Sequence, residues 1–239
     1  MPDVMILSPH CDDAPLSLGT VLLNRSLTPK PRVAVIFSVS RYTKDEPCTG
    51  CAETITALRN AEERKAAEEA NYDVTFLGFG EPFVRSGFGD MDDIFDKSRV
   101  LEQDGVWAGV AAKIADLLAK HDGLTLSPLA CGDHIDHRIV HRAVLEAHAL
   151  GRTGQLGFYE DLPYSANLTE EEILCRVPSL RDNQLRPVVF RGSLERKNAL
   201  LATYESQLEA LQYEEVRQHW TRIGGERVWL PRDVAALFE

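Results

Sequence analysis

The sequence lacks any long hydrophobic segment. No run of about 18 apolar residues, the length that a helix needs to cross a bilayer, occurs in the 239 residues. The first residues are typical of a strand, and they do not resemble the basic and then apolar segment that directs secretion. We therefore expect a protein that has no membrane span and works in the cytoplasm.

Positive charge is also scarce. Lys and Arg number 26 against 37 Asp and Glu, so the formal net charge is -11. Proteins that bind nucleic acids draw much of their affinity from clustered cations that contact phosphates. The composition therefore argues against a nucleic acid as a partner. It leaves self-association into a homo-oligomer open.

Cysteines are few. The chain has 5 of them, an odd number that does not suit the disulfide framework of a secreted domain. Cys48 and Cys51 form a Cys-Thr-Gly-Cys segment, but no second pair follows at the spacing of a zinc ribbon. Cys11 and Cys131 each lie beside a motif that could bind a metal, and we interpret both as small, partly buried thiols.

The sequence does contain an alternation of apolar runs and amphipathic segments. The apolar runs are typical of strands that are covered on both faces, and they lie at 4–7, 33–37, 74–77, 124–126 and 157–159. Segments with helical spacing of apolar residues lie between them, over 14–25, 54–70, 103–120 and 139–147. Because parallel strands are connected by helices, we predict a Rossmann-like α/β fold with helices on both faces of a mostly parallel sheet, in the order 3-2-1-4-5.

The chain as a whole, 1–239, is predicted to form one domain. At 44% hydrophobic residues it can bury a sizeable core. We expect a Rossmann-like core over 1–164 and a C-terminal extension over 165–239 that completes the domain. Within the extension, the pattern predicts a further strand at 187–190 and one long helix that begins after Ser193 and continues past Leu208.

Two polar motifs follow the first and the fourth predicted strands. The segment SPHCDD occupies 8–13, and GDHIDH occupies 132–137. In the order 3-2-1-4-5 these two strands are neighbours at the point where the winding of the sheet reverses. Ligands of such folds bind at the carboxyl ends of the strands there. The topology therefore predicts that the two motifs face each other across one crevice.

The residue types in the two motifs suit a metal. A catalytic zinc takes about three protein ligands and leaves one position for a water molecule, whose pKa it lowers to about 7. His10, Asp13 and His137 would form such a site. Spacing alone leaves other ligand sets open, because His141 lies one helical turn after His137 and His134 could also be a ligand. An alternative without a metal has Asp13 or its neighbour capping the first helix.

The remaining acidic and imidazole groups of the motifs suit proton transfer. Asp12 could accept a proton from the metal-activated water as general base. His134 could stabilise an oxyanion or protonate a leaving amine, with Asp136 fixing its tautomer.

The pair of motifs resembles those of the PIG-L/LmbE-like family of zinc-dependent N-deacetylases. The resemblance implies a Rossmann-like fold and the removal of acetyl groups from N-acetylglucosamine-type compounds. It implies zinc, or Fe²⁺ or another divalent ion, on His10, Asp13 and His137. It also assigns the same roles to the three remaining groups, Asp12, His134 and Asp136. Cys11, in place of the family's usual proline, suggests a divergent subgroup.

Three further segments extend the resemblance. They are RNAE at 59–62, YEDLPY at 159–164, and Lys197 followed by YESQ at 204–207. We expect substrate-binding residues in the first two segments, namely Arg59, Glu160, Asp161 and Tyr164. The glycine-rich segment at 78–90 lacks the order of a phosphate-binding loop, and we interpret it as a rim or lid. Its Arg85 is a candidate to contact an anionic group of the substrate, and the alternative is an arginine that is exposed to solvent.

The expected function is that of a metal-dependent hydrolase. It would remove an N-acetyl group from a small-molecule N-acetylated amino sugar or its conjugate. A non-haem iron oxygenase could use the same two histidines and one carboxylate, but the predicted fold argues against it. A non-catalytic sugar-binding protein could retain a metal, but it would not need a base and an oriented acid.

Overall fold

A seven-stranded sheet forms the centre of the computed structural model, which describes residues 3–24, 29–45, 50–151 and 154–237. The strands are β1 (Val4–Ser8), β2 (Arg32–Val39), β3 (Asp73–Gly80), β4 (Leu124–Pro128), β5 (Gln155–Tyr159), β6 (Arg186–Phe190) and β7 (Glu226–Leu230). Their order is β3-β2-β1-β4-β5-β7-β6, with β1 to β5 parallel and β7 antiparallel to both of its neighbours. The predicted fold class and the order 3-2-1-4-5 are confirmed.

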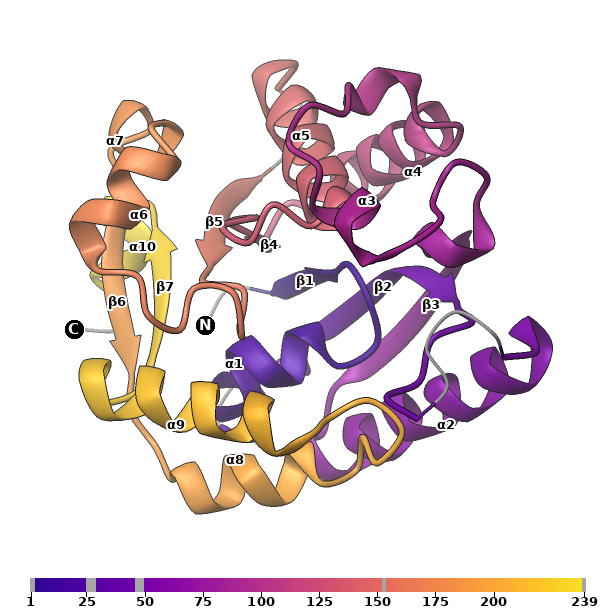
Figure 1. Cartoon of the computed structure of the whole chain (residues 1–239). Helices are drawn as coiled ribbons and strands as arrows, with labels where there is room; N and C mark the ends of the chain where they lie inside the picture. Colours follow the sequence, from indigo (N-terminus) through magenta and orange to yellow (C-terminus); the bar gives the residue numbers. More distant parts are fainter. Residues whose placement is uncertain (1–2, 25–28, 46–49, 152–153, 238–239) are drawn as a thin grey trace.

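Helices cover both faces of the sheet (Figure 1). One layer contains α1 (Asp13–Leu23), α2 (Ala52–Ala70), α8 (Leu194–Leu201) and α9 (Ala210–Ile223). The other contains α3 (Met91–Phe95), α4 (Trp107–Ala119) and α5 (Ile135–Ala149). The short helices α6 (Glu170–Arg176), α7 (Ser179–Asp182), α10 (Arg232–Ala235), η1 (Pro82–Val84) and η2 (Leu101–Gln103) complete the chain.

Each layer of helices has its own hydrophobic core. Strand β1 contributes Val4 and Ile6 to the core under α1, and it contributes Met5 and Leu7 to the core under α4 and α5. Successive side chains of a strand point to opposite faces, so a strand between two cores must be apolar throughout. This explains the continuous apolar runs of the sequence. Within the described ranges, no helix is both long enough and apolar enough to span a membrane.

The C-terminal extension differs from its prediction in two respects. The single long helix is wrong, because α8 ends at Leu201 and α9 begins only at Ala210. The intervening segment bonds to α2 instead, where the hydroxyl of Tyr204 donates to Glu63 Oε2 at 2.7 Å. Strand β7 was not predicted, and it lies between β5 and β6. The boundary between 164 and 165 stays a prediction.

A buried ion pair within the extension lies against the first helix, α1. Lys197 Nζ lies 2.7 Å from Glu226 Oε1, and both side chains are almost completely buried. Glu226 also accepts hydrogen bonds from the backbone amides of Thr20 and Val21. These amides follow a non-helical residue, Leu18, that interrupts α1. The carboxylate therefore caps the second half of α1 as a side chain caps a helix N-terminus.

Candidate active site

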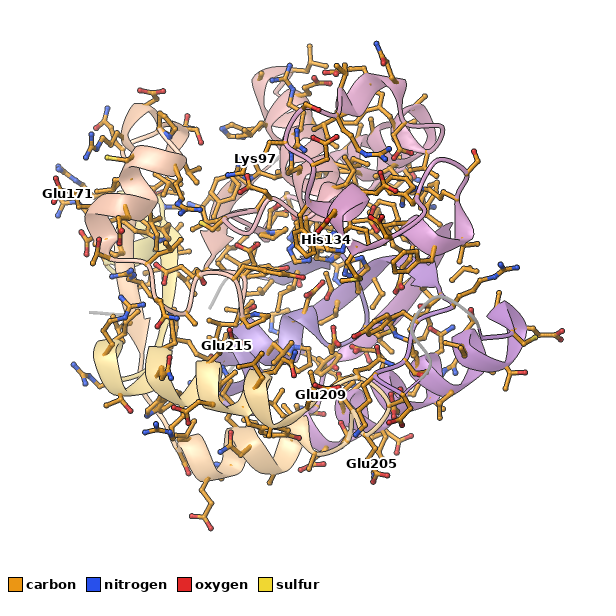
Figure 2. The ribbon with its side chains drawn as sticks, in the orientation of Figure 1. Lys97, His134, Glu171, Glu205, Glu209 and Glu215 are labelled. Atoms are coloured by element: carbon orange, nitrogen blue, oxygen red, sulfur yellow. The ribbon has the colours of Figure 1, made fainter. Side chains whose placement is uncertain are left out.

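The two polar motifs meet at the carboxyl ends of β1 and β4. These strands pair directly, with Ile6 opposite Leu126. The ring of His10 lies 4.8 Å from that of His134 and 5.4 Å from that of His137. The predicted juxtaposition of the two motifs is therefore present. Figure 2 shows His134 near the middle of the molecule, between the segment that carries Lys97 and the α9 side of the fold.

Three buried side chains offer ligand atoms around one point. His10 Nδ1 lies 3.1 Å from Asp13 Oδ2, and His137 Nε2 lies 3.2 Å from the same oxygen. His137 Nε2 is buried and has no hydrogen-bond partner of good geometry within the described residues. Tetrahedral zinc, with bonds of about 2.0–2.2 Å, brings neighbouring ligand atoms to roughly 3.3 Å from each other. The three residues therefore fit a divalent metal ion.

A second carboxylate stands behind each of the two histidines. His10 Nε2 lies 3.0 Å from Asp136 Oδ2, and His137 Nδ1 lies 3.0 Å from Asp161 Oδ2. Each carboxylate thus contacts the ring nitrogen that is not directed at Asp13. Metal-binding histidines usually have such a partner, which fixes the tautomer and the orientation of the ring. The sequence interpretation took Asp161 as a sugar-binding residue, whereas its carboxylate here contacts His137. The carboxylate of Asp136 likewise contacts His10, and only its backbone amide contacts the His134 ring.

Charge strongly perturbs the histidine ligands. Burial lowers the pKa of His137, but Asp13 and Asp161 outweigh this effect and raise the pKa to about 9. Burial also lowers the pKa of His10, yet hydrogen bonds to Asp13 and Asp136 raise it well above its ordinary value. A metal ion at this point would have to displace protons from both rings.

Asp12 has a backbone conformation that is unusual for a residue other than glycine. Its φ is 90°, and although it precedes α1 its side chain makes no capping hydrogen bond. The backbone amide of Asp12 donates to Glu63 Oε2 at 3.2 Å. Burial raises the pKa of the Asp12 carboxyl well above its usual range, and the charge of Asp13 adds to the effect. The carboxyl is thus placed beside the three ligands without serving as a helix cap.

His134 has a defined tautomer. Its Nδ1 accepts a hydrogen bond of 3.2 Å from the backbone amide of Asp136, so the neutral ring carries its proton on Nε2. Burial lowers the pKa of His134 well below its ordinary value, and the charges of His10 and His137 lower it further. A neutral imidazole with a proton on Nε2 can donate a hydrogen bond to a substrate oxygen.

A second group of potential ligands overlaps with the first. His10, His134 and Asp136 also bring ligand atoms within 4.8 Å of one another. The two groups share His10, which faces Asp13 through Nδ1 and Asp136 through Nε2. His141 belongs to neither group, and its Nδ1 bonds to the backbone oxygen of Pro128 at 2.9 Å.

A cavity of about 270 Å³ opens onto these residues. Its lining combines polar groups of the two motifs with Arg59 and Glu81, and it also includes apolar and aromatic side chains. The lining residues are His10, Asp12, Asp13, Leu16, Tyr42, Arg59, Glu81, Pro82, Phe83, Met91, Ile94, Phe95, His134, Pro163, Tyr164, Gln207, Leu208 and Gln212. A Cβ on Gly132 would come within 2.2 Å of the Tyr164 ring, so glycine at 132 permits the ring to lie where it does.

The four predicted substrate-binding residues divide into two pairs. Arg59 and Tyr164 line the cavity, and Arg59 Nη1 also bonds to Glu81 Oε2 at 2.8 Å. Glu160 and Asp161 are not among the lining residues, and both side chains are buried. Glu160 instead contacts residues of α9 and β7, namely His219, Arg227 and Trp229. The sequence does not separate the two pairs, because all four are polar residues of segments that resemble the same family.

The cysteines take no part in the ligand groups found within the described residues. Cys11 and Cys131 are buried free thiols, as interpreted from the sequence, and Cys51 is exposed. Cys48 lies outside the described residues. Burial raises the pKa of the Cys11 thiol well above its usual range, and the nearby carboxylate of Glu63 adds to this.

Comparisons with known proteins agree with this geometry. Residues 5–148 match the family described as PIG-L: GlcNAc-PI de-N-acetylase. The chain is 29% identical over 232 residues to the 2'-N-acetylparomamine deacetylase of Streptomyces fradiae, covering 94% of this chain and 80% of that protein.

Solved structures show the same fold. An A40926 pseudoaglycone deacetylase superposes with a TM-score of 0.68 at 22% identity, over 95% of this chain and 96% of that chain. A deacetylase from the teicoplanin biosynthesis pathway, in complex with teicoplanin, superposes with a TM-score of 0.72 at 18% identity, over 95% and 97% of the two chains. At these identities the two structures bear on the fold alone.

Proposed function

Since the chain belongs to the GlcNAc-PI de-N-acetylase (PIG-L) family, we propose that it hydrolyses the N-acetyl group of an amino sugar or amino-sugar conjugate with the help of a bound divalent metal. The observation that carries the proposal is the group of His10, Asp13 and His137, of which His10 and Asp13 line one cavity together with Asp12. A binding protein would need the ligands but not the buried carboxyl next to them.

The size of the cavity bears on the substrate. At about 270 Å³ it is small for a ligand pocket, since such pockets usually enclose about 300–1,000 Å³. We therefore propose that one acetamido sugar enters, while the rest of a conjugate stays outside, near Met91 and Gln212. The relative from Streptomyces fradiae is named for an N-acetylated amino-sugar conjugate of this kind.

The roles of the protein groups follow from their positions. A bound zinc would polarise the acetamide carbonyl and lower the pKa of a water molecule to about 7. Asp12 would accept the proton of that water and later pass it toward the leaving amine. His134, with its proton on Nε2, would donate a hydrogen bond to the carbonyl oxygen as negative charge develops there. Tyr164 and Arg59 would bind the sugar.

The proposal includes zinc as the metal, a small-molecule substrate as partner with homo-oligomerisation left open, and action in the cytoplasm. Family membership and the curated relative favour hydrolysis over the oxygenase alternative, because both descriptions are those of de-N-acetylases. An assay under nitrogen separates the two chemistries, since only an oxygenase would lose its activity there.

The direct test is an assay of acetate release. Zinc-loaded protein is incubated with N-acetylglucosamine, its glycosides and 2'-N-acetylparomamine, and acetate and free amine are measured separately. We expect equal amounts of the two products, loss of activity on chelation and recovery on adding zinc. If folded, metal-loaded protein releases acetate from no member of this panel, the sugar-binding alternative replaces the proposal.

A further inference from the structure

Of the two alternatives that the sequence leaves for Arg85, exposure to solvent is wrong. Its side chain is only 7% exposed and lies in the segment between β3 and α3. The guanidinium sits between two aromatic rings, 5.2 Å from the centre of Phe37 and 4.9 Å from that of Phe88. A buried cation is costly unless it has partners, so its contacts are informative.

The partners of Arg85 connect the segment before α4 to the candidate metal centre. Nη2 lies 3.1 Å from Asp104 Oδ2, and Nη1 donates to the backbone oxygen of Gly80 at 2.8 Å. Nη1 also lies 2.7 Å from Asp136 Oδ1. The N–H does not point along this last line, so the contact acts through charge and not as an aligned hydrogen bond. Asp104 in turn accepts a bond from the amide of Val106, just before α4.

The two oxygens of Asp136 face different partners. Oδ1 faces the guanidinium, whereas Oδ2 lies 3.0 Å from His10 Nε2. The carboxylate is fully buried, so its direction is set by these contacts. With Nε2 held by Asp136, the other ring nitrogen of His10 is the one that faces Asp13, 3.1 Å away.

We propose that Arg85 is a positioning residue for the metal centre, which acts on His10 through Asp136. Its charge holds the Asp136 carboxylate against His10 Nε2 and so directs Nδ1 toward Asp13 and His137. The same charge makes the overlapping group, which includes Asp136 and His134, unfavourable for a second cation, because that cation would lie beside a guanidinium. Arg85 thereby selects one of two groups that share His10.

The inference rests on the proposed function only through the presence of a metal. Partners behind a metal ligand typically contribute a factor of about 10–100 in metal affinity. We therefore expect Arg85→Met to weaken zinc binding by about 10–100-fold, measured by competition with a chelator of known affinity. Arg85→Lys retains a cation in the same place and should restore part of the loss.

Arg99 provides a matched control. Its guanidinium also lies over Phe88, at 4.3 Å, and pairs with Asp93, but it does not contact Asp136. Arg99→Met should therefore leave zinc affinity within about twofold of wild type. This substitution changes the packing on Phe88 but not the contacts of the Asp136 and Asp161 carboxylates with the histidines.

A second measurement addresses the choice between the two ligand groups. His134→Ala should not change zinc affinity in the wild-type background, where His134 is not a ligand. In the Arg85→Met background it should weaken binding further, because the overlapping group then holds part of the metal. Such coupling between two substitutions is what a double-mutant cycle measures.

Zinc affinity of folded Arg85→Met within twofold of wild type would overturn the proposal. If that variant does not fold, Arg85→Gln takes its place, because it also removes the cation but keeps a donor for the Gly80 oxygen. Wild-type zinc affinity of Arg85→Gln, together with equal effects of His134→Ala in the wild-type and Arg85→Gln backgrounds, then overturns the proposal. Because none of these measurements requires turnover, failure of the deacetylase proposal would appear separately, as absent acetate release by proteins that bind zinc as expected.

Discussion

Asp12 holds its left-handed backbone through contacts that come from another element. The φ of 90° is costly for a residue other than glycine, by about 1–3 kcal/mol. The amide of Asp12 bonds to Glu63 on α2, and Glu63 is held by the hydroxyls of Tyr72 and Tyr204. A strained residue beside a ligand group suggests that the position of its carboxyl matters for the reaction.

Replacing the proposed base tests this at the residue scale. Asp12→Asn should reduce acetate release by about 10²–10⁴-fold, the usual contribution of a general base. Asparagine tolerates positive φ, so the unfolding temperature and the zinc affinity should stay close to those of wild type. Full activity in this variant would remove Asp12 from the mechanism.

Two neighbouring acids should behave in opposite ways. Asp161 backs His137, so Asp161→Asn should weaken zinc binding by about 10–100-fold. Glu160 contacts Trp229 and His219 instead, so Glu160→Gln should lower the free energy of unfolding by about 1–3 kcal/mol. Chelator competition and urea unfolding of both variants provide the comparison.

Each variant is the control for the other. Loss of zinc affinity in Glu160→Gln, together with unchanged zinc affinity in Asp161→Asn, would contradict both assignments. A higher KM in either variant, with zinc affinity and stability unchanged, would also contradict the assignment. It would return that acid to the sugar-binding role inferred from the sequence.

A local motif reveals the candidate ligands of the metal but not the carboxylates behind them. His10, Asp13 and His137 could be predicted as candidate ligands from the sequence, because side chains that suit a metal are clustered at the ends of two strands and the family resemblance chose among them. The partners behind them could not be identified. Asp161 lies 24 positions after His137, and the contact of Asp136 with His10 spans 126 positions, so both contacts depend on tertiary packing.

At the scale of elements, the interrupted helix α1 depends on the extension. Lys197→Met would leave Glu226 buried without its cation, which typically costs about 3–5 kcal/mol. We expect a loss of this size in the free energy of unfolding, measured in urea. The matched control is Lys30→Met, whose pair with Asp73 is exposed and should contribute less than about 1 kcal/mol. Equal effects of the two substitutions would contradict the stabilising role of the buried pair.

The break between α8 and α9 explains the wrong prediction of a single helix. Apolar residues continue at helical spacing across the break, so periodicity alone favours one helix. Tertiary bonds override it, because the Ser206 amide and hydroxyl both donate to Glu62 on α2, at 2.8 and 2.7 Å. The helix α9 then begins at a capping box formed by Glu209 and Gln212.

At the scale of the whole sheet, the order of the first five strands was predictable. Strand β6 was predicted without its neighbours, and β7 was not predicted. Strands β1 to β5 alternate with helices, and the rules for such connections leave few orders. The position of β7 between β5 and β6 depends on antiparallel pairing, with Phe158 opposite Trp229. Nothing in the local pattern of β7 tells which strand it pairs with.

Metal binding should stabilise the whole molecule. A ligand that binds only the folded state at 100 times its dissociation constant contributes about 2.7 kcal/mol. Zinc at this excess should therefore raise the unfolding temperature of the metal-free protein, as measured by calorimetry. His10→Ala should show little of this increase. An equal increase in both proteins would mean that zinc binds elsewhere.

The central claim is that His10, Asp13 and His137 together hold the metal. Anomalous diffraction at the zinc absorption edge, from crystals of the zinc-loaded protein, tests it most directly. We expect one strong anomalous peak within bonding distance of His10 Nδ1, Asp13 Oδ2 and His137 Nε2. A peak bound by His134 and Asp136 instead, or no peak between the two motifs, would contradict it.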